Sequence, residues 1–137
     1  MLMDELPENW TYPLIQPKLI EKYLQVKNNS IIGTIVTVTV DRPLGSYHPG
    51  HKDMHYPVNY GYIEGVMAPD GEEQDAYILG VNEPVGKFTG KIIAIVQRKD
   101  DIEEKWVVVP DGMMFSKDEI RQQIYFQEQY FDSEIVM

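Results

Sequence analysis

The sequence has 137 residues, 12 of them basic and 22 acidic, which gives a formal net charge of −10 at pH 7. Its length and its hydrophobic fraction of 43% suit one globular domain and exclude wholesale disorder, and no apolar run approaches the roughly 18 residues of a membrane helix, so no membrane partner is expected. The acidic balance argues against a nucleic-acid partner, because basic side chains dominate such binding, and the lack of cysteine fits a cytoplasmic location.

The first 30 residues are predicted to form an arm and one short helix. Residues 1–17 mix acidic, proline and aromatic residues without a period, whereas residues 18–27 carry four apolar side chains at helical spacing. We expect this segment, residues 1–30, to pack on a neighbouring part of the molecule or on a second subunit. The domain proper is then expected to span residues 31–137.

The middle of the chain is predicted to be a series of short strands. Residues 31–40 are mostly β-branched, and strand-like runs follow at 60–67, 76–81, 91–97 and 105–109, with turn signals between them. Short strands at this spacing indicate a barrel or a sandwich rather than a parallel sheet.

One helix is predicted near the carboxyl end. Ser116 and Glu119 form a capping-box pattern, and Ile120, Ile124 and Phe131 then recur on one face. The fold class is therefore expected to be mainly β with flanking helices (α+β).

The turn at residues 70–75, Asp-Gly-Glu-Glu-Gln-Asp, is strongly acidic and leads into an apolar strand. Crowded carboxylates repel one another, and a hard divalent cation such as Mg²⁺ relieves that repulsion. The alternative is an ordinary solvated hairpin turn. An EF-hand loop is excluded, because Asp75 stands where that loop requires glycine.

A second acidic turn covers residues 100–104, Asp-Asp-Ile-Glu-Glu, and lies between two predicted strands. Two acidic turns on neighbouring strand pairs could form opposite walls of one metal site. Arg98 and Lys105, which flank the turn, would then suit an anionic ligand over that metal. The alternative is a charge-balanced surface that serves solubility.

All three histidines lie within the eight residues 48–55, close to four tyrosines. Three interpretations stay open: a transition-metal site, a packed aromatic loop, or a phosphate-binding wall. In the last of these, His48, His51 and Lys52 donate hydrogen bonds to the anion. The spacing of the histidines matches no strong zinc pattern.

The segment Tyr-Pro-Val-Asn-Tyr-Gly-Tyr-Ile at residues 56–63, followed by the acidic turn at 70–75, resembles the soluble, single-domain, magnesium-dependent inorganic pyrophosphatases. The resemblance continues through the second acidic turn, Val109-Pro110 and the final helix, and so covers about Val36 to Phe131. It implies a small closed OB-like barrel of five to six strands plus a C-terminal helix, with the active site at the barrel mouth.

The same resemblance implies a hydrolase of phosphate metabolism. The reaction would be metal-dependent hydrolysis of inorganic pyrophosphate to two orthophosphates by a carboxylate-bound, Mg²⁺-activated water, with Mn²⁺ as the alternative metal. It also implies a cytoplasmic homo-oligomer. One alternative is a related hydrolase of another small phosphate compound. The other is a catalytically weakened, pyrophosphatase-like binding or regulatory module.

Site roles carried over from the family fall into three groups. The expected metal ligands are Asp41, Asp70, Asp75, Asp100 and Glu103, with Asp101 as a rival for Asp100. The expected catalytic residues are Glu72, in the place of the proton acceptor, and Asp75. The expected substrate-binding residues are Tyr60, Lys105 and Tyr130, and we add Arg98, His48, His51 and Lys52 from their charge and hydrogen-bonding capacity.

The sequence also departs from the family pattern. Glu72 replaces an aspartate, and no proline stiffens the first acidic turn. The stretch from Asp41 to Tyr56 is too short for the family's usual hairpin, so the lysine and arginine of that hairpin have no clear counterparts. Phe131 stands where a further lysine is expected. Fewer fixed cations predict weaker pyrophosphate binding.

Overall fold

The structure is a computed structural model that describes residues 31–99 and 103–137. The predicted arm at residues 1–30, together with Asp100 and Asp101, lies outside the described residues. Within the described part, no helix is both long enough and apolar enough to cross a membrane.

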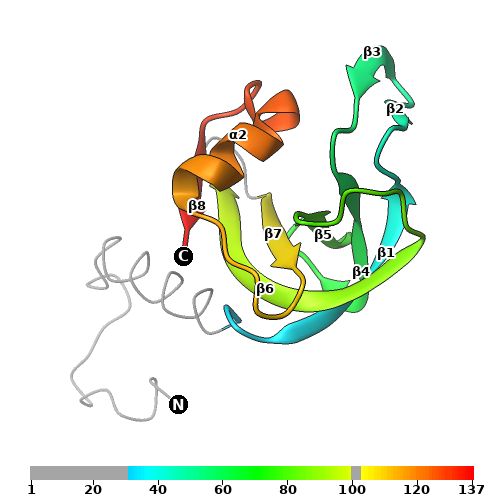
Figure 1. Cartoon of the computed structure of the whole chain (residues 1–137). Coiled ribbons are helices and arrows are strands. Elements are labelled where there is room, and N and C mark those ends of the chain that lie inside the picture. Colours follow the sequence, from blue (N-terminus) through cyan, green and yellow to red (C-terminus); the bar gives the residue numbers. More distant parts are fainter. Residues whose placement is uncertain (1–30, 100–102) are drawn as a thin grey trace, which may run out of the picture.

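Five strands close into a barrel, which confirms the expected fold class. They are β1 (Ile35–Arg42), β4 (Asn59–Met67), β5 (Glu73–Ile78), β6 (Lys87–Arg98) and β7 (Glu104–Val109). Their order is β1-β4-β5-β7-β6, and β1 pairs with β6 to close the ring. Every pairing in this ring is antiparallel except that of β5 with β7, which is parallel. Figure 1 shows β6 as the long curved strand that reaches from β1 to β7.

Two strand boundaries differ from the sequence prediction. β1 begins at Ile35 rather than Ile31, because residues 31–33 form a turn in which Gly33 has a φ of +99°. β5 begins at Glu73, inside the predicted acidic turn, because Asp75 pairs with Tyr62 of β4. Asp75, the last acid of that turn, is therefore held on a strand.

Three further strands were not predicted. β2 (Tyr47–His48) and β3 (His51–His55) form a small hairpin, so the short stretch before Tyr56 does hold a turn of its own. β8 (Ser133–Val136) pairs antiparallel with β6 at the edge of the barrel. In Figure 1 the hairpin and the helix α2 (Lys117–Glu128) stand on either side of the same end of the barrel.

The helix α2 is capped as the sequence predicts. The Ser116 side chain accepts the Glu119 N–H at 3.2 Å, and the Glu119 carboxylate accepts the Ser116 N–H at 2.9 Å. Ile120 and Ile124 are buried. Phe131 does not extend this apolar face, because the helix ends at Glu128 and the chain turns there to enter β8.

The core has two parts, on opposite faces of the same strands. One cluster, which includes Val38, Ile92 and Val108, fills the barrel, and the other, which includes Tyr77 and Ile124, packs the sheet against α2. The second halves of β5, from Ala76, and of β7, from Trp106, are buried on both faces, and there the sequences are continuously apolar rather than alternating.

Gly61 allows β4 to approach β1 closely. A Cβ atom at this position would lie 1.9 Å from the Thr39 carbonyl oxygen, so no other residue fits without moving a strand. The neighbouring residue, Tyr60, is 9% exposed and takes its place in the core from this close contact.

Candidate active site

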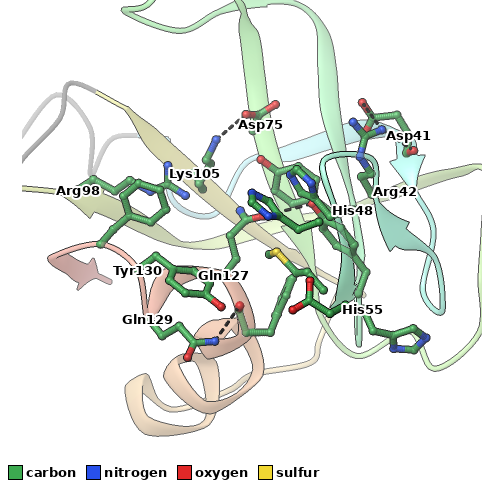
Figure 2. A pocket seen from close by; sticks show the side chains of 17 residues that line it. Asp41, Arg42, His48, His55, Asp75, Arg98, Lys105, Gln127, Gln129 and Tyr130 are labelled. Carbon is green, nitrogen blue, oxygen red and sulfur yellow. Dashed lines mark hydrogen bonds and ion pairs between the residues drawn. The ribbon is translucent and has the colours of Figure 1, made fainter.

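A pocket of about 850 Å³ opens at the barrel end between the β2–β3 hairpin and the end of α2. It brings together many of the side chains singled out from the sequence (Figure 2). Those that line it are Asp41, His48, His51, Tyr60, Asp75, Arg98, Lys105 and Tyr130. Its lining also includes His55, the third histidine of the predicted loop, and residues that the sequence did not single out, among them Arg42, Asp53, Gln127 and Gln129.

Other predicted site residues do not line this pocket. Asp70 and Glu72 are exposed at the β4–β5 turn, where Asp70 Oδ1 accepts the Glu72 N–H at 3.0 Å and Gly71 has a φ of +86°. This is an Asx turn, in which the side chain of Asp70 accepts a hydrogen bond from the backbone of the same turn. Lys52 is exposed on β3. Glu103 does not line the pocket either. The functional roles of the predicted site residues, whether or not they line the pocket, stay predictions.

Lys105 lies between two of the predicted metal ligands. Its Nζ donates to Asp75 Oδ2 at 2.6 Å and to Glu103 Oε1 at 2.9 Å, and its side chain is only 4% exposed. The contact with Asp75 follows from the parallel pairing of β5 with β7, in which the next residues along, Ala76 and Trp106, are partners. Figure 2 shows the Lys105–Asp75 pair at one side of the pocket.

The environment of Lys105 keeps it charged. Burial by itself opposes the ammonium form, but Tyr60 and Asp75 outweigh it, so the pKa of Lys105 lies above its usual value. Burial also raises the pKa of Tyr60, which keeps its hydroxyl protonated. Lys105 and Tyr60 therefore offer a ligand a fixed positive charge and a hydroxyl group that can donate a hydrogen bond.

Arg98 is the second buried cation of the pocket. Its Nη1 donates to Glu103 Oε2 at 2.7 Å, and its Nη2 and Nε donate to the two oxygens of Glu128 at 2.9 and 3.1 Å. The ring of Phe131 lies over the guanidinium, 3.6 Å from Cζ to the ring centroid, which is a cation–π contact. Phe131 thus packs on a cation instead of supplying one.

Glu128 is held as a carboxylate although its side chain is 6% exposed. Burial by itself raises its pKa, but hydrogen bonds from Arg98, Ser133 and Tyr77 outweigh that effect, so the pKa of Glu128 lies below its usual value. Gln127 Nε2 donates to the Tyr77 hydroxyl at 2.7 Å and extends the network toward the hairpin. This network could not be predicted from the sequence, because its members lie on four different elements.

The hairpin supplies an imidazole wall. His48 Nδ1 accepts the Gly50 N–H at 2.9 Å, so in the neutral ring Nε2 carries the proton and can donate. The His48 ring is parallel to that of Tyr56, with centroids 6.3 Å apart, and lies 5.1 Å from the His51 ring. His48 thus packs on an aromatic ring, and His48 and His51 also line the pocket, whereas a phosphate-binding or metal-binding role of these rings stays a prediction.

Asp41 and Arg42 form the wall opposite Arg98 (Figure 2). Arg42 Nη1 lies 3.8 Å from Asp41 Oδ2, and burial raises the pKa of Asp41 above its usual value. The β1–β4 register shifts between Val40 and Arg42, and such an irregularity redirects side chains at the end of a strand. That shift carries no sequence signal, which is why Arg42 was missed.

The pocket therefore offers an anion many donors. Arg42, Arg98 and Lys105 supply positive charge, and the histidine rings and Tyr60 supply hydrogen-bonding groups. Carboxylates lie among them, so the wall is mixed in charge rather than purely basic. Such a mixture suits a small, highly charged ligand.

Comparisons with known proteins relate the sequence to one family. The sequence model of a family described as inorganic pyrophosphatase matches residues 24–127. An inorganic pyrophosphatase of Halalkalibacterium halodurans is 28% identical over 103 residues, which cover 70% of this chain and 61% of that protein. The chain therefore spans less than two thirds of the length of that relative.

Solved structures share the fold. An inorganic pyrophosphatase from Ehrlichia chaffeensis superposes with a TM-score of 0.58 at 19% identity, covering 75% of this chain and 85% of that one. One from Coxiella burnetii gives a TM-score of 0.56 at 17% identity, covering 76% and 84%. At these identities the likeness concerns the barrel and its helix.

Proposed function

This chain belongs to the inorganic pyrophosphatase family, and from that premise we propose that it hydrolyses pyrophosphate to two orthophosphates in the pocket at the barrel mouth. The observation that carries the proposal is the meeting of Tyr60, Asp75 and Lys105, from three different strands, around one anchored ammonium group. These residues stand at family motif positions.

The proposed reaction is attack of water on one phosphorus atom with cleavage of the bond to the bridging oxygen. Its transition state is rich in negative charge, so the protein contributes mainly positioning and charge neutralisation. Lys105 and Arg42 are placed to bind phosphoryl oxygens, and Tyr60 is placed to donate a hydrogen bond. Asp75 holds Lys105 and is the acid of the pocket closest to that cation.

Dependence on Mg²⁺, with Mn²⁺ as the alternative, is part of the proposal and comes from the family. The described residues, taken as arranged, do not fit a resident metal cluster: no group of three or more of their His, Asp and Glu side chains could hold an ion. Two of the predicted ligands, Asp75 and Glu103, share Lys105 instead. No step is therefore assigned to a resident ion.

The direct test is release of orthophosphate from pyrophosphate, with and without Mg²⁺. Asp75→Asn should lower kcat/KM by about 100-fold or more, because the amide no longer holds Lys105 by charge. Asp111→Asn is the matched control, since Asp111 is exposed and lies outside the pocket. Full activity of Asp75→Asn would remove Asp75 from the site, and no release by the unaltered protein would refute the function.

A second candidate is hydrolysis of another small phosphate compound. The observation that favours it is the aromatic and imidazole wall, where His48 lies over Tyr56 and Tyr130 is 70% exposed beside the pocket. An organic group attached to the phosphate could pack there. Saturable phosphate binding without release from any compound would instead identify a binding or regulatory module.

We also propose a cytoplasmic homo-oligomer, on the strength of the resemblance. Sedimentation at several protein concentrations tests the assembly, and fractionation of the source cells tests the location. A single species with the mass of one chain, 15.9 kDa, would refute the oligomer.

A further inference from the structure

The carboxylates beside the pocket are neutralised by side chains of the protein. Glu103 is bound through one oxygen to Lys105 and through the other to Arg98, and Asp75 shares Lys105. Glu128 takes the remaining donors of Arg98. Three carboxylates thus face two fixed cations on one continuous network, which leaves a single net negative charge.

These cations are difficult to displace. The side chains of Arg98 and Lys105 are each 4% exposed, and Arg98 is also covered by the ring of Phe131. A divalent ion bound by both Asp75 and Glu103 would take over the two carboxylate partners of Lys105. The ammonium group of Lys105 would then be buried between two positive charges, the ion and the Arg98 guanidinium. Removing one partner from a buried ion pair is strongly destabilising.

Magnesium can be held in another way. The ion keeps several waters and is commonly bound through one or two carboxylates together with substrate phosphates, rather than by an all-protein cage. The side chains of Asp75 and Glu103 are 34% and 27% exposed, and Asp75 lines the pocket, so neither carboxylate is fully enclosed by its ion pairs. A phosphate that draws Lys105 toward itself would also bring most of the oxygen ligands that the ion needs.

We propose that the free protein holds no resident divalent cation in this pocket, and that Mg²⁺ or Mn²⁺ enters as the counter-ion of the phosphate substrate. The inference rests on the proposed function, because it takes a pyrophosphate-like compound as the ligand. Arg98 and Lys105 act in the free pocket as the charge balance that metal ions would otherwise provide. Metal and phosphate then bind with positive cooperativity.

Equilibrium dialysis of the full chain tests the proposal without turnover. One chamber set contains Mn²⁺ alone, a second contains imidodiphosphate (a pyrophosphate analogue with a nitrogen bridge) alone, and a third contains both. Manganese and phosphorus on the protein side are measured by elemental mass spectrometry. With Mn²⁺ alone, we expect no more manganese in the protein chamber than in the opposite chamber. With Mn²⁺ and the analogue together, we expect manganese and phosphorus to be both enriched in the protein chamber. The analogue should raise the apparent affinity for Mn²⁺ at least about tenfold.

A variant without the positive charge of Lys105 should bind Mn²⁺ even when no phosphate compound is present. Lys105→Met leaves Asp75 without its cation and Glu103 paired only with Arg98, so Mn²⁺ alone should bind at least about tenfold more tightly than to the unaltered chain. Lys87→Met is the matched control, because Lys87 is exposed on β6 outside the pocket, and it should change nothing. Near-ultraviolet circular dichroism checks that both variants are folded.

Two results would overturn the inference. If Mn²⁺ alone binds the unaltered protein as tightly as it does with the analogue, the metal is resident, and the proposed hydrolysis is unaffected. If phosphorus shows no excess in any chamber, the pocket takes no such ligand, and the inference fails together with the proposed substrate class. Should Lys105→Met fail to fold, the comparison of the three chamber sets on the unaltered chain still decides.

Discussion

Arg98 and Glu128 form a buried, two-pronged ion pair that joins β6 to the last turn of α2, with nitrogen–oxygen distances of 2.9 and 3.1 Å. The pair fixes the end of the helix against the barrel. Gln127 and Tyr130, which flank Glu128, are pocket residues. The shape of the pocket wall therefore depends on an ion pair between the lining residue Arg98 and Glu128, which does not line the pocket.

Glu128→Gln should destabilise the protein, because the buried Arg98 guanidinium then keeps only one carboxylate partner, Glu103. Breaking a buried pair in this way costs about 3 kcal/mol or more. Urea unfolding followed by circular dichroism measures the loss. Glu134→Gln is the matched control, since Glu134 is exposed on β8 and its replacement should change the free energy of unfolding by no more than about 0.5 kcal/mol. Equal effects of the two variants would show that the pair does not stabilise the fold.

The same carboxylate predicts a pH dependence of stability. The pKa of Glu128 is lowered in the folded state, so its contribution is fully present above the usual glutamate value of about 4.5 and is lost as pH falls below it toward the folded pKa. The difference in unfolding free energy between the unaltered protein and Glu128→Gln should therefore be constant near neutrality and shrink below about pH 4.5. A difference that stays constant down to pH 3 would mean that the carboxylate charge is irrelevant.

The barrel could be predicted from the sequence because its strands carry local signals. The β-branched run that became β1 and the apolar runs of β6 and β7 needed no tertiary information. The capping box of α2 is equally local. β8 was missed because four residues without a period resemble a loop, and only pairing with β6 makes them a strand.

The site was less predictable than the fold. Tyr60, Asp75 and Lys105 could be singled out because each belongs to a contiguous motif. Their contact depends on the pairing of β5 with β7, which the sequence does not encode locally. Arg98 was chosen for its charge alone, and its partner Glu128 reads as an ordinary helix residue. Long-range ion pairs of this kind leave no periodic trace.

Gly61→Ala should destabilise the barrel next to the site. The new Cβ would lie 1.9 Å from the Thr39 carbonyl oxygen, and overpacking of this kind typically costs about 1–3 kcal/mol. Gly86→Ala is the matched control, because a Cβ at Gly86 meets nothing within 4 Å. Thermal unfolding of the two variants checks the prediction, and a Gly61→Ala protein as stable as the control would mean that β4 can move away from β1 freely.

The last prediction concerns the imidazole wall of the hairpin. His48 and His51 line the pocket, and the Nδ1 of His48 is occupied by the Gly50 N–H, so Nε2 is the atom that faces a ligand as a donor. Histidine is the side chain whose charge ordinarily changes between about pH 5 and 8. If these rings contact phosphate, their positive form binds it better than their neutral form.

The KM for magnesium pyrophosphate should then rise with pH across the neutral range in the unaltered protein. The double variant His48→Gln/His51→Gln keeps a hydrogen-bond donor at each position but cannot carry a positive charge there, so its KM should be higher at pH 6 and nearly independent of pH. The comparison of kcat/KM between pH 6 and pH 8 in both proteins measures the effect, because that ratio reports ionisations of the free enzyme. Superimposable profiles would mean that the two histidines only pack against Tyr56 and that the positive charge for the phosphate comes from Arg42 and Lys105 alone.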